Sequence, residues 1–466
     1  MQTRTEKDSL GTVDVPAGTL YGAQTARAII NFPISGLRAN PALIRAIAMI
    51  KLAAARANGE LSLIKPDQAK AIEQAAQEIL DGKHHDQFVV DVFQAGAGVS
   101  FHMNANEVIA NRANQLLGEP LGTYTKVHPN DHVNYGQSTN DVFPTAMRLA
   151  ALLALEDLYP VLDSLSEAFS AKATEFDNIL KSGRTHMQDA TPIRLGQEFA
   201  AYAVAIAKSR DHIRTTANSL RELGLGGSAV GTGINTHPQY RVRAIANLAK
   251  ISGQLLEPAA DMRYTMQSCA PMAEVSGALR TLALETIRIS NDLRLLSSGP
   301  NTGFNEIALP ALQPGSSIMP GKVNPVLAEL TAMVGFQVIG NDQAVALAVQ
   351  AGQLELNVMM PTMAHNVLQS ITILTNTLRE FDHRCIRGIT ANEQRCNFYA
   401  QSTVSIATAL NPYIGYAKAA EIVKESVATG ESVIDIARGK NLLTEEQIDE
   451  ILDPRAMTEP REKLDK

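Results

Sequence analysis

The feature that most constrains this chain is a set of long stretches with helical periodicity and few interruptions. Apolar residues recur at the spacing of a helix over residues 142–175, 193–223 and 271–297, and the pattern resumes over 326–384. Pro160 falls inside the first stretch, where we expect it to kink the helix rather than end it. Helices this long, joined by few loops, predict an all-α fold built around an elongated bundle.

The predicted helices are apolar on more than one face, so a single bundle leaves apolar surface to be covered. This pattern favours association of several copies of the chain, with a large monomeric bundle as the alternative. Aromatic residues make up only 5% of the chain and Trp is absent. A core of Leu, Ile, Val, Ala and Met fits helix packing better than a large sheet.

Changes in pattern along the chain predict three domains. Residues 1–138 form an N-terminal domain that starts with an irregular segment of about forty residues, followed by helices over 41–58 and 66–81. Residues 139–393 form the central helical bundle. Residues 394–466 form a small C-terminal helical domain.

The composition excludes several classes of protein. The net charge is −7 and no basic run occurs, so no nucleic-acid partner is expected. No apolar run of membrane-spanning length and no signal peptide is evident, so no membrane partner is expected. The 3 cysteines form no CxxC pair, and no His, Asp or Glu group has metal-ligand spacing. We therefore expect a reduced, cytoplasmic setting with no metal and no cofactor.

The segment Gly315–Pro325 (GSSIMPGKVNP) is the most distinctive polar motif. Its glycines suit a mobile loop, Ser316 and Ser317 offer hydroxyl oxygens, Lys322 offers a positive charge and Asn324 an amide. Such a loop can close over an anion and present a serine oxygen to it. A plain linker between domains is the alternative interpretation.

Three other polar segments interrupt the helical pattern. Residues 136–141 (GQSTND) precede a long helix, so they fit both a helix cap and an anion site at the helix start. Residues 183–189 (GRTHMQD) contain one histidine, which in isolation fits a structural role better than a catalytic one. Residues 96–100 (GAGVS) form a glycine-rich turn without nucleotide-binding spacing.

These motifs resemble the aspartase/fumarase superfamily. The loop 315–325 matches its signature essentially in full, and residues 6–11, 103–113, 137–141, 183–197, 231–233 and 352–358 resemble it in the same order. Within the superfamily, Gln137–Asn140 is most similar to the aspartase form, because fumarases usually have Ser at the position of Thr139. Residues 127–131 and 142–145, in contrast, resemble fumarases.

The resemblance implies elimination of ammonia from L-aspartate, without a metal or cofactor, in a homotetramer whose active sites are shared between subunits. It implies that Ser316 is the catalytic base and that Glu329 pairs with His186. The residues that it implies for the two carboxylates of a small dicarboxylate substrate are Ser138, Thr139 and Ser317 for one, and Thr185, Lys322 and Asn324 for the other. Asn140 and His186 would then face the leaving amine.

Two positions depart from the family pattern. Val99 stands where the family typically has a substrate-contacting Thr, and Met360 stands where aspartases usually have Glu. Valine keeps the shape of threonine but lacks its hydroxyl. Fumarate hydratase and a lyase for a different amine therefore remain alternatives, as does a binding protein on an inactive lyase fold, against which the intact Ser316, Lys322 and His186 argue.

Overall fold

A computed structural model describes residues 2–460 of the 466-residue chain. The fold is mainly helical, as predicted, with a few short two-stranded sheets. The chain divides into two compact units. Unit 1 comprises residues up to 159, 211–283 and 336–375, and unit 2 comprises 160–210, 284–335 and residues from 376 onward.

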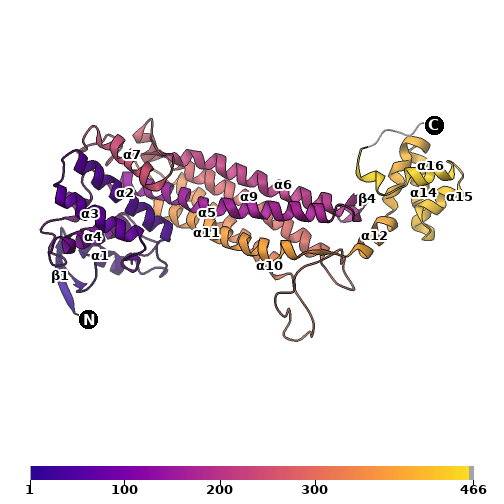
Figure 1. Ribbon diagram of the computed structural model, residues 1–466, viewed down its shortest axis with the longest axis horizontal. Helices are drawn as coiled ribbons and strands as arrows, with labels where there is room; N and C mark the ends of the chain where they lie inside the picture. Colours follow the sequence, from indigo (N-terminus) through magenta and orange to yellow (C-terminus); the bar gives the residue numbers. More distant parts are fainter. Residues whose placement is uncertain (1, 461–466) are drawn as a thin grey trace. The chain divides into compact units, whose positions relative to one another are not determined.

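Five long helices contribute residues to both units (Figure 1): α5 (Thr139–Glu175), α6 (Leu195–Ala217), α9 (Ala270–Leu296), α10 (Val326–Gln350) and α11 (Met360–Arg384). The prediction of long helices is confirmed, and α5 continues through Pro160 without a break. The predicted run over 326–384 is wrong in one respect, because it is two helices. The Asn357 amide donates to the Ala348 and Val349 carbonyls, 3.0 and 3.1 Å away, and so satisfies the last turn of α10.

Polar pairs connect neighbouring helices within each unit. In unit 2, Tyr202 of α6 donates a hydrogen bond to Asp292 of α9 (3.2 Å). In unit 1, Asn341 of α10 donates to the Ser370 hydroxyl of α11 (3.0 Å). A satisfied polar contact of this kind fixes the relative position of two helices.

Unit 1 begins with an antiparallel hairpin and continues with helices that support the start of α5. Besides its parts of the five long helices, unit 1 contains β1 (Thr3–Asp8), β2 (Gly11–Pro16), α1 (Ala23–Asn31), α2 (Pro41–Glu60), α3 (Pro66–Leu80), α4 (Val99–Leu116), a π-helical turn (Pro129–Val133), β5 (Glu222–Leu223), α7 (Tyr240–Ser252), β6 (Glu257–Pro258) and α8 (Met262–Gln267). The predicted helices over 41–58 and 66–81 are confirmed as α2 and α3.

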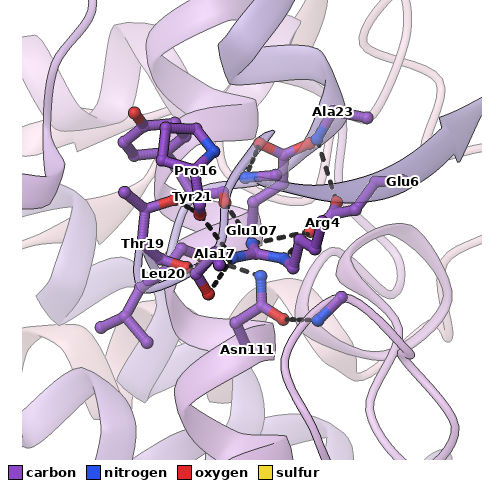
Figure 2. A network of polar contacts seen from close by, with 12 residues as sticks. Arg4, Glu6, Pro16, Ala17, Thr19, Leu20, Tyr21, Ala23, Glu107 and Asn111 are labelled. Atoms are coloured by element: carbon purple, nitrogen blue, oxygen red, sulfur yellow. Dashed lines mark hydrogen bonds and ion pairs between the residues drawn. The ribbon is translucent and has the colours of Figure 1, made fainter. Parts of the chain in front are cut away.

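Helix α1 lies in the segment predicted to be irregular. Its first turn is held by the buried Glu107 of α4, whose carboxylate accepts hydrogen bonds from the backbone N–H groups of Gly22, Gln24 and Thr25 at 2.8–3.1 Å. Figure 2 shows Glu107 in the same polar network as Arg4, whose guanidinium pairs with the Glu6 carboxylate and donates to backbone carbonyls of the segment between β2 and α1. The helix therefore depends on residues distant in sequence.

Unit 2 carries short strands and the C-terminal helices. Its elements are β3 (Leu180–Thr185), β4 (Gln188–Arg194), β7 (Ile307–Ala308), β8 (Thr390–Ala391), α12 (Glu393–Ser402), α13 (Asn411–Ile414), α14 (Tyr416–Thr429), α15 (Val433–Gly439) and α16 (Glu445–Ile451). Helices α14, α15 and α16 lie together (Figure 1) around a cluster of buried aliphatic residues that includes Leu410, Ile422 and Ile448. The division into three domains stays a prediction.

Helix α10 is unusually apolar for its exposure. By length and composition alone it is the one helix among residues 2–460 that could cross a membrane, which is weak evidence for a span. Three of its large apolar side chains, Met333, Phe336 and Leu347, are more than half exposed. A contiguous exposed apolar surface usually marks an interaction site.

Candidate functional site

The start of α5, in unit 1, carries one group of the predicted site residues. Ser138 precedes the helix, and its hydroxyl oxygen accepts a hydrogen bond from the Asn140 backbone N–H (3.2 Å), as a cap does. Thr139 and Asn140 occupy the first turn and are half-buried. The free N–H groups and the dipole of a helix start favour an anion here. The cap and the anion site predicted from residues 136–141 are therefore compatible.

A buried carboxylate fixes the loop beside this helix start. Asp141 accepts hydrogen bonds from the backbone N–H groups of Ser138 (2.9 Å), Gly226 (2.9 Å) and Ser228 (3.0 Å). Burial raises the pKa of Asp141 to about 6, although these N–H donors oppose the increase. The same loop presents the Ala229 carbonyl, which accepts a hydrogen bond from the Asn140 side chain (2.8 Å).

Sequence reasoning missed two residues behind Thr139. The His102 ring nitrogen Nδ1 lies 2.7 Å from the Thr139 hydroxyl oxygen, and Nε2 of the same ring lies 2.7 Å from the Lys51 ammonium nitrogen. Lys51 and His102 are both fully buried. The signal that would have pointed to Lys51 is a lone lysine within the apolar helical run of α2.

Val99 opens α4, the helix that also carries His102, and its side chain is 40% exposed. It follows Gly98, which has a left-handed φ of +91°. A Cβ atom at Gly98 would lie 2.3 Å from the Phe143 ring, so only glycine fits this turn. Met360, the other departure from the family pattern, is buried at the start of α11.

A separate group of predicted residues lies in the loop 315–325 of unit 2. The Gly315 N–H donates to the Lys322 carbonyl (2.7 Å), and the Asn324 side chain donates to the Gly315 carbonyl (2.8 Å). These bonds tie the two ends of the loop together. The Asn324 amide therefore retains one N–H for a ligand, while Lys322 is exposed.

Within this loop, Ser316 is set apart by its surroundings. Its hydroxyl oxygen accepts hydrogen bonds from the backbone N–H groups of Met319 (2.9 Å) and Ile318 (3.2 Å). Two N–H donors stabilise negative charge on that oxygen and so favour its ionised form. The neighbouring Ser317 is exposed.

The turn between β3 and β4 carries Thr185 and His186, which are both exposed. His186 has a φ of +51°, a conformation uncommon for a residue other than glycine. Arg184 anchors this turn through an ion pair with the buried Glu306 (3.0 Å). Glu329 lies in the first turn of α10. No hydrogen bond or ion pair between described residues joins it to His186, so that pairing stays a prediction.

The structure thus gathers seven of the predicted residues in two groups, and Thr185, His186 and Glu329 belong to neither. Ser138, Thr139 and Asn140 share one helix start in unit 1, and the loop 315–325 gathers Ser316, Ser317, Lys322 and Asn324 in unit 2. Among residues 2–460, no three His, Cys, Asp or Glu side chains cluster as metal ligands.

Comparison with known proteins gives matches over most of the chain. Residues 11–340 match the "Lyase" family profile, and residues 406–459 match "Fumarase C C-terminus". The aspartate ammonia-lyase of Bacillus subtilis (strain 168) is 49% identical over 98% of this chain and 96% of its own length. The class II fumarate hydratase of Halobacterium salinarum is also 49% identical, over 98% of this chain and 97% of its own length.

A solved structure titled fumarate lyase:delta crystallin, from Brucella melitensis, has a TM-score of 0.95 and 47% identity, and the alignment covers 98% of this chain and 100% of that one. The helical fold and the match over most of the chain define a lyase. The chain belongs to the aspartase/fumarase superfamily. Because an aspartase and a fumarase are equally similar to it, overall identity does not select the substrate, and the site residues must.

Proposed function

We propose that this chain is an aspartate ammonia-lyase, which reversibly eliminates ammonia from L-aspartate in the anti sense to give fumarate. Seven similar proteins that are 46–49% identical to it carry that name. The observation that carries the elimination chemistry is the environment of Ser316, whose oxygen accepts hydrogen bonds from two backbone N–H groups in the signature loop. A serine hydroxyl becomes an effective base only when neighbouring donors or charges stabilise its oxyanion.

In the proposed reaction, the Ser316 oxygen acts as an alkoxide base. It takes a proton from the carbon next to a carboxylate and becomes a hydroxyl. The electron pair of that C–H bond moves into the carboxylate and forms a doubly charged aci-carboxylate. The electrons then return to form the carbon–carbon double bond, and the C–N bond breaks as the amine leaves with its electron pair. The barrier falls when donors stand where the negative charge develops.

Residues of both groups, together with Thr185 at the end of β3, share the work of binding. Ser138, Thr139 and Ser317 would hold the carboxylate that becomes the aci-form, because hydroxyl and N–H donors at a helix start stabilise added negative charge. Thr185, Lys322 and Asn324 would hold the other carboxylate, with Lys322 supplying the positive charge.

The leaving group is where an aspartase differs from a fumarase. The NH₂ group of Asn140 donates to the Ala229 carbonyl. Its amide oxygen points the other way and can accept a hydrogen bond from a ligand. An ammonium group offers hydrogens to such an acceptor. His186, with Glu329 as its partner, would complete the surroundings of the amine.

Fumarate hydratase is the second candidate. It is favoured by the Halobacterium relative, which is as similar as the aspartases, and by the fumarase-like segments 127–131 and 142–145. Thr139 argues for the aspartase. Val99 and Met360 favour a third candidate, a lyase for a different amine, because Val99 lacks the hydroxyl that four-carbon substrates meet in the family.

The proposed enzyme is a homotetramer in which three subunits build each site. The exposed apolar side chains of α10 support this, since a partner helix would cover them. Diluting the enzyme until the tetramer dissociates should therefore abolish activity, and a fully active monomer would contradict the shared site. A cytoplasmic setting is supported by the three cysteines, which are all free and buried.

The substrate is tested by supplying L-aspartate and L-malate separately and following fumarate by ultraviolet absorbance. Fumarate from aspartate alone is the expected result. Fumarate from malate alone would replace the proposal by a fumarase. No fumarate from either, with a folded tetramer, would point to another amine substrate and to Val99 and Met360 as its determinants.

A further inference from the structure

A buried lysine and a buried histidine connect the core of unit 1 to the helix start that carries Thr139. Lys51 comes from α2 and His102 from α4, and neither exposes more than 1% of its surface. The contacts from Lys51 Nζ to His102 Nε2 and from His102 Nδ1 to Thr139 Oγ1 are both 2.7 Å long. A buried basic side chain is costly unless every hydrogen finds a partner.

The other neighbours of Lys51 are two amide oxygens, Oδ1 of Asn134 at 3.0 Å and Oε1 of Gln137 at 2.8 Å. The NH₂ groups of both amides donate elsewhere, to the carbonyls of Gln137 and Val133 respectively. The amide oxygens must therefore face Lys51, and they can only accept. An ammonium group has three hydrogens for three acceptors here, the third being the His102 ring.

The charge of Lys51 decides which way the chain of hydrogen bonds runs. If Lys51 is an ammonium ion, Nε2 of His102 accepts, and the ring proton lies on Nδ1 and is donated to Thr139. If Lys51 were neutral, its lone pair would accept from Nε2–H, and Nδ1 would take the hydroxyl hydrogen of Thr139. In the first arrangement the Thr139 hydrogen is free for an anion, and in the second it is not.

Two effects on the charge oppose each other. Burial lowers the pKa of Lys51 well below its usual range, while the buried carboxylate of Asp141 favours the charged form. Burial together with the charge of Lys51 lowers the pKa of His102, which keeps the ring neutral and leaves it one N–H to place.

We propose that Lys51 is held as an ammonium ion and acts through His102 to fix the Thr139 hydroxyl as a hydrogen-bond donor to the substrate carboxylate. Lys51 and His102 are then positioning residues, which touch no substrate themselves. The proposal rests on the proposed function, which places Thr139 against the carboxylate that becomes the aci-form.

A double-mutant cycle on the full-length enzyme tests this. Thr139→Val, His102→Gln and the double variant are compared by kcat and KM for L-aspartate. Each single variant should lower kcat/KM about tenfold to a hundredfold, the effect of losing one hydrogen bond to a charged group. The double variant should be no worse than Thr139→Val alone. His102→Asn, whose amide nitrogen can replace Nδ1, should recover part of the loss.

The chain of hydrogen bonds from Lys51 through His102 to Thr139 is called the relay below. If the losses of the two single variants multiply in the double variant, His102 acts independently of the Thr139 hydroxyl and the relay is overturned. An unchanged kcat/KM in His102→Gln alongside a loss in Thr139→Val would also overturn the relay, but would leave the proposed function intact. No loss in Thr139→Val would refute the assignment of Thr139 and the relay together.

Because His102 lies in the core, its variants are checked for assembly by gel filtration and thermal unfolding. Gln137→Met offers the same test at a partly buried position. It removes one acceptor of Lys51, so it should lower kcat/KM in the wild-type background and leave it unchanged in the Thr139→Val background. An equal loss in both backgrounds would overturn the relay. This test leaves the buried His102 in place.

Discussion

Replacement of Gly98 by alanine should destabilise the chain by a calculable amount. Its φ of +91° costs about 1–2 kcal/mol for a residue with a Cβ atom. The added Cβ would also lie 2.3 Å from the ring of Phe143, which is buried and packs edge-on against Phe101 at 6.2 Å. Overpacking of this kind costs about 1–3 kcal/mol. The expected total for Gly98→Ala is therefore about 2–5 kcal/mol.

Gly96→Ala is the matched control. Gly96 also has a positive φ, +79°, but its Cβ would meet only Val99 at an ordinary contact distance of 3.5 Å. It should cost about 1–2 kcal/mol, from backbone strain alone. Urea unfolding of both variants at one protein concentration measures the difference. Equal destabilisation of the two would refute the clash with Phe143, and a Phe143→Leu background should reduce the cost of Gly98→Ala but not that of Gly96→Ala.

Three further predictions concern charge and substrate. Glu78 receives two hydrogen bonds from Arg112, which lower its pKa to about 2, so Glu78→Gln should cost about 1 kcal/mol at pH 7 after allowance for solvent screening. The pKa of Glu78 is about 2 in the folded chain and 4.5 for a free carboxyl, so the ion pair stabilises the fold above about pH 4.5 and this stabilisation is lost as the pH falls to about 2. The difference from wild type in urea unfolding should therefore disappear over this range. A difference that persists at about pH 2 would contradict the ion pair. Glu107→Gln turns an NH₂ group towards the N–H donors of α1 and should lower the free energy of unfolding, measured with urea, by about 3 kcal/mol, whereas a change below about 1 kcal/mol would contradict the role of Glu107 as the cap. Val99→Thr should raise kcat/KM about tenfold for the four-carbon substrate at little cost in stability, and a loss of activity would favour a substrate that needs an apolar contact there.

The long helices could be predicted because their apolar pattern extends over many turns and is largely independent of distant residues. Helix α1 could not, because its first turn depends on Glu107, more than eighty residues away in sequence. The break between α10 and α11 was missed for a similar reason. It depends on one side chain, Asn357, folding back onto the last carbonyls of α10.

The site could be predicted only in part. The loop 315–325 and residues 138–140 are contiguous motifs, so the sequence shows which side chains each brings together. The contacts of Lys51 with His102, and of His102 with Thr139, join three segments that no local pattern connects. Resemblance to a family supplied the role of Ser316, and only the structure supplies the two N–H donors that make the role physically reasonable.

The most direct test of the central claim compares Ser316→Ala with the wild-type chain on L-aspartate, following fumarate and ammonia together, with Ser317→Ala as the matched control. We predict equal amounts of fumarate and ammonia from the wild-type chain. Ser316→Ala should lose about a hundredfold to ten-thousandfold in kcat, as expected when a catalytic base is removed. Ser317→Ala should retain measurable turnover with a raised KM. A folded Ser316→Ala variant that keeps the wild-type kcat would contradict the account, because the oxygen that accepts the two N–H groups of the loop would then not be the base.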